Sequence, residues 1–498
     1  MPPLRHRMFL ILVCLISVSA AAAIFELIPN LMPFRDSTGA VATYNTAGAI
    51  NQRNPFFQSL GTNGRTCATC HQADQAFSLS AAGARTVYMR THGLDPLFAS
   101  VDGANCPTDE SSEPDAHSLL LNNGLIRIGI TPPANLQFTI AVVHDPYGCA
   151  LTYNPQTGAP IYSVYRRPLP STNLRYLSTI MFDGRETLMP LNNPATVDAN
   201  LDFDLTDQAT SAILIHAQGA EPPTEQQLAQ IVQFETGLST AQTRDNQAGT
   251  LSYEGPAGGP FNLSKQPYTP GVNDPLGGNP IGVNFDSSAF SLYTAWENIP
   301  APTHFPWVPL TLSQSSDERK REIATGERIF NTQPLIITGV RGLNDNATIG
   351  SPASITGTCT TCHNSPNVGN HSVALPLDIG TSRQAGDETD PVIIAALHQL
   401  SVPDLPVYKI TGCADPAHPG STLTFYTSDP GKGLISGLCS DVNRGKGPIL
   451  RGLAARAPYF HNGAAANLQE LVRFYNQRFQ MNLTDDQQRD LIAFLNSL

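Results

Sequence analysis

The sequence predicts a mainly α-helical, loop-rich protein in which two similar domains follow one another along the chain. Three observations support this fold class. The pattern Cys-x-x-Cys-His occurs once in each half, at residues 67–71 and 359–363. Each half also ends in a segment with the periodicity of an amphipathic helix. Finally, the chain has 41 Pro and 39 Gly but only 14% charged residues, which indicates many loops around a core built on cofactors.

The Cys-x-x-Cys-His pattern attaches a c-type haem. Its two thiols bond to the haem vinyl groups, and the adjacent histidine binds the iron. A zinc site or a redox-active cysteine pair is the alternative, but no second Cys or His pair lies nearby in the sequence to complete a zinc site. We therefore predict two cytochrome c-like domains, each around one covalent haem c. The residues that hold the two haems are Cys67, Cys70, His71, Cys359, Cys362 and His363.

Residues 1–23 have the pattern of a secretory signal peptide, which predicts export to the periplasm. Arg5 and Arg7 precede an apolar run at residues 8–18, and small residues follow at 20–23. An uncleaved N-terminal anchor is the alternative, because the apolar stretch 8–25 is just long enough to span a bilayer. This segment is the only membrane attachment that the sequence suggests.

Four further cysteines fall as one pair in each half of the chain. Export to an oxidising compartment favours disulfides. We predict the pairs Cys106–Cys149 and Cys413–Cys439. Four free thiols are the alternative. Cys14 lies within the signal segment.

The first domain is expected at residues 24–240. A short amphipathic segment at 54–60 leads into its haem motif, and a helix closes the domain. That helix begins near Thr224, where Gln227 completes a capping box. Its apolar stripe comprises Leu228, Ile231, Val232, Phe234 and Leu238.

Residues 241–315 are rich in Gly, Pro and Asn and contain both tryptophans, Trp296 and Trp307. We interpret them as a linker or an insertion that packs over the domains. The second domain, 316–498, has its lead segment at 324–331, a helix at 467–479 and a closing helix that begins at Thr484 with Gln487 as its capping partner. Regular β-structure is not predicted beyond short alternations such as residues 137–143.

The net charge of −12 argues against a nucleic-acid partner, whose phosphates attract basic surfaces. An acidic protein attracts a basic redox partner, although acidity also simply aids solubility.

Residues 446–463 read Lys-Gly-Pro-Ile-Leu-Arg-Gly-Leu-Ala-Ala-Arg-Ala-Pro-Tyr-Phe-His-Asn-Gly, and residues 182–185 read Phe-Asp-Gly-Arg. Together with the two haem motifs, these segments resemble the bacterial di-haem cytochrome c peroxidase/MauG family. Members of that family have Trp-Asp-Gly-Arg where this chain has Phe-Asp-Gly-Arg at residues 182–185. The resemblance implies that hydrogen peroxide reacts at the N-terminal haem. It also implies that the C-terminal haem collects electrons or stores an oxidising equivalent. His71 and His363 would be the proximal ligands, and His461 a neighbour rather than a ligand.

The second axial ligand of the C-terminal haem is expected to be Tyr475. Peroxidase members of the family have Met at this position, whereas MauG-like members have Tyr. A phenolate lowers the iron potential and a thioether raises it, so this residue favours the MauG type. Two alternatives are that Tyr475 is ordinary core, or that Met481 binds the iron instead.

At the N-terminal haem, Gln208 matches a Gln that the family places above the iron. The family's acid–base Glu corresponds to Gln218, so no carboxylate stands there. His216 could act as the base that moves a proton of the peroxide, because its reference pKa is near neutrality. A structural His is the alternative. In some members of the family a histidine of the segment that corresponds to residues 126–133 binds the iron of the resting enzyme. This segment has no histidine here, so we expect an iron whose second axial position is open or bound by water.

Phe182 replaces the family's Trp between the haems and is not readily oxidised. Arg185 and Arg451 match family arginines that would pair with haem propionates, with ordinary surface salt bridges as the alternative. The family's interdomain calcium site has Arg167 in place of an Asn ligand, and Arg456 in place of a Thr that binds through its carbonyl. The loss of the Asn side chain argues against calcium here.

The sequence thus predicts a periplasmic di-haem oxidoreductase of the peroxidase type, with hydrogen peroxide as substrate and a small redox donor such as a cytochrome c or a cupredoxin. Two other functions stay open. A non-catalytic electron carrier would have two six-coordinate irons that do not react with peroxide. An oxygenase would form a stable oxygen adduct beside a hydrophobic channel.

Overall fold

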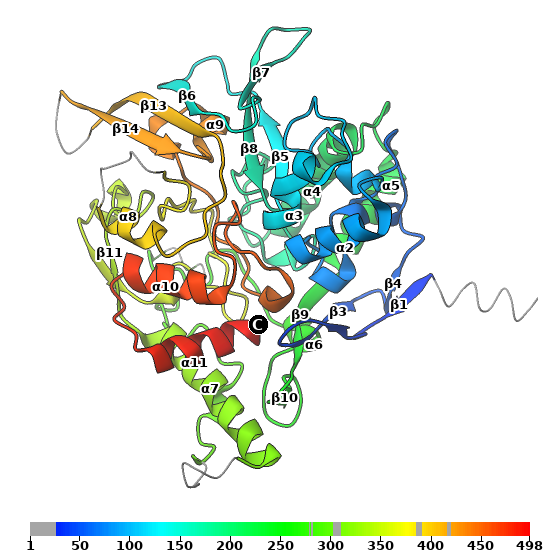
Figure 1. The fold of residues 1–498 in the computed structure, drawn as a ribbon. Coiled ribbons are helices and arrows are strands. Elements are labelled where there is room, and N and C mark those ends of the chain that lie inside the picture. Colours follow the sequence, from blue (N-terminus) through cyan, green and yellow to red (C-terminus); the bar gives the residue numbers. More distant parts are fainter. Residues whose placement is uncertain (1–25, 278, 280–281, 302–309, 385–390, 416–419) are drawn as a thin grey trace, which may run out of the picture.

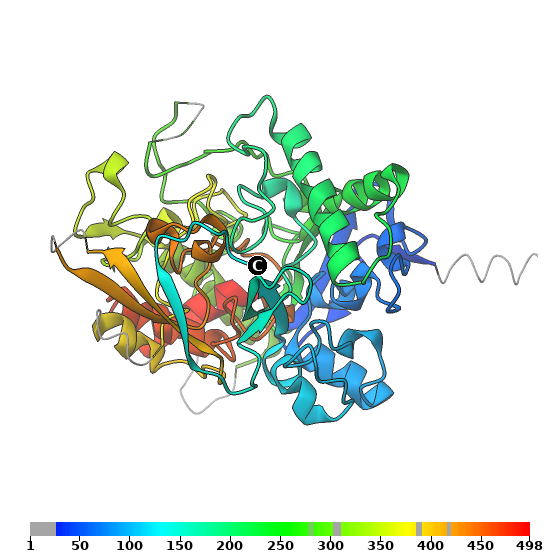
Figure 2. The ribbon, with the colours of Figure 1, turned by 90° about the horizontal axis from the view of Figure 1, so that it is seen from above.

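The computed structural model describes residues 26–277, 279, 282–301, 310–384, 391–415 and 420–498. The N-terminal and C-terminal halves lie side by side (Figures 1 and 2). The expectation of a mainly α-helical fold is wrong. Helical residues, 3-10 turns included, make up 31% of the described residues and strand residues 17%. The protein is an α+β structure with several small antiparallel sheets.

Five sheets hold the fourteen strands of the described residues. Two of them are two-stranded, β1 (Leu27–Pro29) with β4 (Ala49–Asn51) and β11 (Leu335–Ile337) with β12 (Ile355–Gly357). The four-stranded sheet has the order β10 (Gly249–Thr250), β9 (Leu238–Asp245), β3 (Gly39–Asn45) and β2 (Phe34–Arg35). The two three-stranded sheets are β5 (Ile126–Ile130), β8 (Pro160–Arg166), β7 (Leu151–Tyr153), and β14 (Thr422–Thr427), β13 (Val407–Ala414), β6 (Thr139–His144).

One of these sheets joins the two halves of the chain. Strand β6 comes from the first half and pairs with β13 of the second half, with Ile140 opposite Ile410 and Val142 opposite Tyr408. The predicted alternation at residues 137–143 corresponds to β6. Seven of the other strands have only two or three residues, too few to show a period, whereas β13 alternates between half-buried and buried residues and could have been predicted. In β3, by contrast, only Tyr44 is not fully buried, so the period-2 signal is absent.

The helices of the N-terminal half are α2 (Ala81–Thr91), α3 (Ser118–Asn123), α4 (Val197–Ile215) and α5 (Glu225–Thr236). The prediction for α5 is confirmed, since Thr224 caps it and Gln227 completes the capping box. Its predicted stripe is buried up to Phe234, whereas Leu238 belongs to β9. Helix α5 packs against α4 and against the 3-10 turn Pro55–Phe57, which occupies the expected lead segment.

The helices of the C-terminal half are α6 (Pro260–Ser264), α7 (Leu312–Thr332), α8 (Pro391–Leu397), α9 (Gly433–Ser436), α10 (Leu468–Arg478) and α11 (Asp485–Asn496). The two predicted helices are confirmed as α10 and α11, and Thr484 with Gln487 forms the capping box of α11. The lead segment 324–331 is the end of α7. Helix α7 packs on α11 so closely that a Cβ at Gly326 would overlap the Asp490 carbonyl group.

The segment 241–315 is partly ordinary core. Phe290, Tyr293 and Trp296 are buried against α7 and α11. Strand β9 continues from residue 238 to 245 and so crosses the proposed start of this segment. Trp307 lies outside the described residues. The division into domains stays a prediction.

The predicted signal or anchor at residues 1–23 also lies outside the described residues. Among the helices that the structure describes, none is long and apolar enough to cross a membrane.

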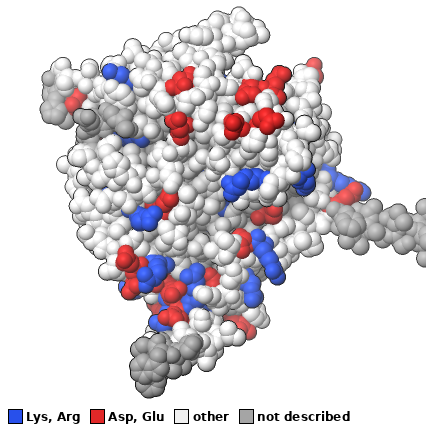
Figure 3. Space-filling model, viewed as in Figure 1, with Lys and Arg blue, Asp and Glu red and all other residues white. Residues whose placement is uncertain are grey.

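The charged side chains are unevenly distributed over the face of the molecule that Figure 3 shows. Acidic side chains prevail over the upper part of this face, and both signs of charge mix over α7 and α11.

Both predicted disulfides are confirmed. Cys106 pairs with Cys149 and Cys413 with Cys439, with Cα atoms 5.9 Å and 5.5 Å apart. These distances fall in the usual range for a disulfide. The other cysteines of the described residues are free, namely Cys67, Cys70, Cys359 and Cys362.

Candidate functional site

The two Cys-x-x-Cys-His segments have the same local structure. Each forms a 3-10 turn, Cys67–Thr69 in one half and Cys359–Thr361 in the other. The last residue of each turn is a threonine whose Oγ1 accepts a hydrogen bond from the backbone N–H of the threonine just before the turn. The donor is Thr66 for Thr69 and Thr358 for Thr361, and the distance is 3.0 Å in both cases. The backbone N–H of each histidine then donates to the first cysteine carbonyl, again at 3.0 Å. The sequence repeat is therefore also a structural repeat.

Both histidines have Nδ1 beside a backbone carbonyl oxygen. His71 Nδ1 lies 3.2 Å from the Phe77 carbonyl oxygen, and His363 Nδ1 lies 2.6 Å from the Gly369 carbonyl oxygen. A carbonyl can only accept, so each Nδ1 carries the proton and each Nε2 keeps a lone pair. Burial lowers the pKa of both rings, that of His71 to about 4, and keeps them neutral. This is the state in which histidine binds a metal.

A cavity of about 290 Å³ lies beside His363. Cys359 and Cys362 line it together with aliphatic side chains of α10 and α11. Both candidate axial residues, Tyr475 and Met481, also line it. The cavity thus brings both cysteines, the histidine and both candidate ligands together, and its lining is consistent with either Tyr475 or Met481 as the axial ligand. Burial and then the Cys362 and Cys359 thiols raise the pKa of Tyr475, so its phenol is protonated in the free chain.

The cavity wall carries four cations, of which Arg451 and Arg456 are buried and Arg167 and Lys446 are half-buried, but its lining includes no Asp or Glu among the described residues. Burial lowers the pKa of all four, that of Lys446 to about 8. Buried cations are normally paired with an anion. Here Nε of Arg167, and Nε and Nη2 of Arg451, have no hydrogen-bond partner within the described part of the chain. Carboxylates of a bound haem would suit these donors, so the residues present fit that group.

The two arginines expected to pair with haem propionates lie in different places. Arg451 lines the cavity, whereas Arg185 donates to Asp183 at 2.9 Å and does not line it. The role of both toward a haem stays a prediction. At the family's calcium position, Arg167 donates to the carbonyl groups of Arg456 and Leu79.

The candidate base His216 belongs to a chain of charged groups near the first haem motif. His216 Nδ1 lies 2.5 Å from Asp102 Oδ2, and the other oxygen of Asp102 accepts from Arg65. Burial alone would raise the pKa of Asp102, but Arg65 and His216 outweigh it and lower the pKa. Asp102 therefore stays ionised and holds His216 with Nε2 available. Besides burial, an electrostatic interaction with His216 lowers the pKa of His71.

Sequence reasoning missed Asp102 and Arg65. Arg65 precedes Cys67 by only two residues and could have been noticed, whereas Asp102 lies 114 positions from His216. Gln208, the other candidate at this site, lies half-buried on α4, and Gln218 is exposed. The structure gives Gln208 no defined contact with His216.

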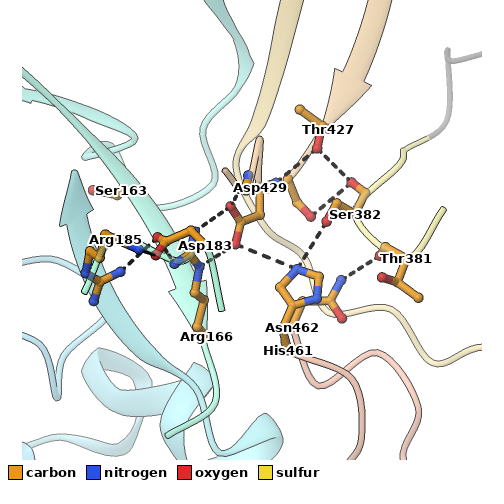
Figure 4. Close-up of polar contacts among 12 residues, drawn as sticks. Ser163, Arg166, Asp183, Arg185, Thr381, Ser382, Thr427, Asp429, His461 and Asn462 are labelled. Carbon is orange, nitrogen blue, oxygen red and sulfur yellow. Dashed lines mark hydrogen bonds and ion pairs between the residues drawn. The ribbon is translucent and has the colours of Figure 1, made fainter. Parts of the chain in front are cut away.

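A buried polar network lies where the halves meet (Figure 4). Arg166 contacts Asp183 at 2.5 Å and Asp429 at 2.6 Å, and the three side chains are at most 3% exposed. Next to it, the Phe182 ring stacks on His461 with ring centres 4.1 Å apart. Phe182, which the resemblance places between the haems, therefore touches the Tyr-Phe-His segment of the other half.

Ser382, His461 and Asp429 lie together in this network but do not form a hydrolytic triad. Ser382 Oγ lies 3.1 Å and Asp429 Oδ2 lies 3.7 Å from the same atom, His461 Nε2. A triad needs the serine and the carboxylate on opposite nitrogens of the ring. Burial lowers the pKa of His461 to about 4, so the ring is neutral. The network therefore joins the halves rather than activating a nucleophile.

The chain is similar to several proteins named as peroxidases. It is 29% identical over 149 residues to cytochrome-c peroxidase IdrP2 of Denitromonas iodatirespirans, covering 28% of this chain and 36% of the relative. It is 28% identical over 151 residues to cytochrome-c peroxidase IdrP1 of Pseudomonas sp. (strain SCT), covering 28% and 36%. It is 31% identical over 118 residues to cytochrome c551 peroxidase of Nitrosomonas europaea, covering 21% and 35%. The similar segments thus span about a third of these relatives. No family model and no solved structure matches the chain.

Proposed function

We propose that the protein is a periplasmic di-haem oxidoreductase of the cytochrome-c peroxidase type. Hydrogen peroxide would be reduced at the N-terminal site, with electrons relayed through the C-terminal site from a small redox protein. The observation that carries the proposal is the pair of equivalent turns, each with two free thiols and a half-buried histidine whose Nδ1 contacts a backbone carbonyl oxygen. The similarity to proteins named cytochrome-c peroxidase supports the same activity.

A haem c bound at each site would supply an iron that exchanges single electrons and, at an open position, reacts with peroxide. The residues of the chain would hold it. Cys67 and Cys70, or Cys359 and Cys362, form the covalent links, and His71 or His363 offers Nε2 as the axial ligand. Tyr475 or Met481 faces the second site. Arg451 is placed to receive a carboxylate.

The proton transfer is assigned to His216. Reduction of one hydrogen peroxide to two waters consumes two electrons and two protons. A positioned base assists by taking a proton from the attacking oxygen and returning it to the leaving one. Asp102 fixes the His216 tautomer and stabilises the ring when it carries the extra proton, as a carboxylate does for histidine in other acid–base sites.

The proposal is tested with the purified holoprotein and hydrogen peroxide. The expected result is two covalent haems per chain, one of them high-spin, and a rapid optical change at that haem on addition of one equivalent of peroxide. With a reduced small c-type cytochrome present, two donor molecules should be oxidised per peroxide. Two low-spin haems that do not respond to peroxide would overturn the proposal in favour of an electron carrier.

Removing the proposed base should slow the peroxide reaction. We expect His216→Gln to lower kcat/KM for peroxide by about 10²–10⁴-fold, the usual contribution of general acid–base catalysis. Asp102→Asn keeps the ring but loses the ionised partner, so a smaller loss is expected. Steady-state assays over a range of peroxide concentrations give both values.

His92→Gln is the matched control for this prediction, because His92 is exposed at the end of α2. It should leave kcat/KM unchanged. Equal rates in the His216 and His92 variants would show that His216 is a structural residue.

A further inference from the structure

Glu235, near the end of α5, is a buried carboxyl group with no place in the proposed reaction. Its side chain is 4% exposed, and Oε2 has no hydrogen-bond partner among the described residues. Burial raises its pKa to about 7, and a hydrogen bond with Ser171 opposes the rise only in part. Unsatisfied buried polar atoms are rare in folded proteins and usually have a cause.

Glu235 follows Phe234, which belongs to the apolar cluster against which Cys67 of the N-terminal motif packs. After burial, its charge is the largest influence that raises the pKa of the Cys67 thiol, which is one of the two haem-attachment groups. The neighbouring Phe234 ring packs against Phe77 at 6.0 Å between ring centres. The Phe77 carbonyl oxygen accepts from the backbone N–H of Ser171 at 2.9 Å and from His71 Nδ1. The carboxyl group and the axial histidine are thus linked through the same short segment.

The elements packed against α5 are α4 and the 3-10 turns at residues 55–57 and 174–176. Their titratable side chains are Asp198, Asp202, Asp204, Asp207, Arg175 and Tyr176, with His216 at the end of α4. Asp204 accepts from the Leu188 and Met189 backbones, and Arg175 donates to the Gln266 carbonyl. The pKa of Glu235 is moved by burial and by Ser171, and by no basic side chain of the described residues.

We propose that Glu235 is a proton-binding site coupled to the N-terminal haem. It takes up one proton from solvent when the donor delivers one electron to that haem, and it releases the proton when the electron leaves. The step adds one electron and one proton, so the net charge of the buried site does not change. The inference rests on the proposed function, because it requires a haem attached at Cys67.

The physical reason is electrostatic. Charges separated by a few ångströms of protein interact far more strongly than in water. Negative charge gained by the haem raises the pKa of Glu235, and by linkage a proton on Glu235 makes the electron easier to accept. Glu235 is therefore a positioning residue that acts through the haem, not a group that touches peroxide.

The test is a redox titration of the holoprotein between pH 5.5 and 8.5, followed in the absorbance of each haem. The reduction potential of the N-terminal haem should fall with rising pH in the wild type. The fall should be lost in Glu235→Gln, which keeps the shape but cannot ionise. Glu327→Gln is the control, because Glu327 is equally buried with a pKa raised to about 7, but accepts from the Leu292 and Tyr293 backbones in the other half. The control should keep the slope.

A second readout needs no variant. The proton uptake of the wild type on reduction, measured in weakly buffered solution, should be greatest near neutral pH. A pH-independent potential, or a slope that survives in Glu235→Gln, would overturn the inference. Failure of the proposed function would look different. The wild type, with its two haems, would keep the pH-dependent potential but would not consume peroxide.

Discussion

Replacing both cysteines of the first motif, Cys67→Ala with Cys70→Ala, is expected to leave one covalent haem instead of two and to abolish peroxide reduction. Without thioether links the haem is not retained, and His71 has no iron to bind. We expect peroxide consumption to fall by at least about 10³-fold, because the loss removes the reacting centre rather than one assisting group. Haem content after denaturation and a peroxide electrode measure the two effects.

The matching change in the other half separates the roles of the two sites. Cys359→Ala with Cys362→Ala should also leave one haem, but this protein should still react once with a stoichiometric amount of peroxide. Its steady-state turnover with an external donor should be lost, because in the proposed function electrons enter through the missing site. The reverse pattern in the two variants would mean that the N-terminal and C-terminal roles are exchanged.

Arg166→Leu is expected to destabilise the protein by about 3–5 kcal/mol, the usual effect of removing one partner of a buried ion pair. The change leaves the carboxyl groups of Asp183 and Asp429 in a buried environment without the Arg166 guanidinium, at 0% and 1% side-chain exposure. Burial alone would raise the pKa of Asp183, and Arg166 is the largest influence that lowers it. Denaturant unfolding followed by far-UV circular dichroism measures the loss.

Arg185→Leu is the matched control. Arg185 contacts the same Asp183, but its side chain is 20% exposed and Asp183 keeps its bond to Arg166. A loss of about 1 kcal/mol or less is expected, as for other solvent-accessible ion pairs. Equal losses in the two variants would contradict the central place given to Arg166.

The helices could be predicted where their signals are local. Thr224 with Gln227 and Thr484 with Gln487 mark helix starts through contacts three residues apart, and the structure places helices there. The two pairings that join distant segments, β3 with β9 and β6 with β13, could not be predicted from local patterns. Thr43 and Thr240 face one another across β3 and β9, 197 positions apart.

The residues of the candidate site also fall into those that the sequence reveals and those that it does not. The cysteines and histidines of the two motifs are recognisable because their spacing is part of the chemistry. The partners of His216 and the surroundings of Glu235 are not, since they depend on which distant loops fold against the first motif. Phe182 and His461 were each singled out in the sequence, but only the structure shows that they stack on one another.

The strand pair β6–β13 has a consequence for how far the two halves of the chain can be separated. Strand β6 of the first half pairs with β13 of the second half. A cut between the halves would leave β6 without its partner and would expose the edge of β13, and unpaired strand edges promote aggregation. We therefore expect the halves to be excised, exchanged or inherited together and not singly.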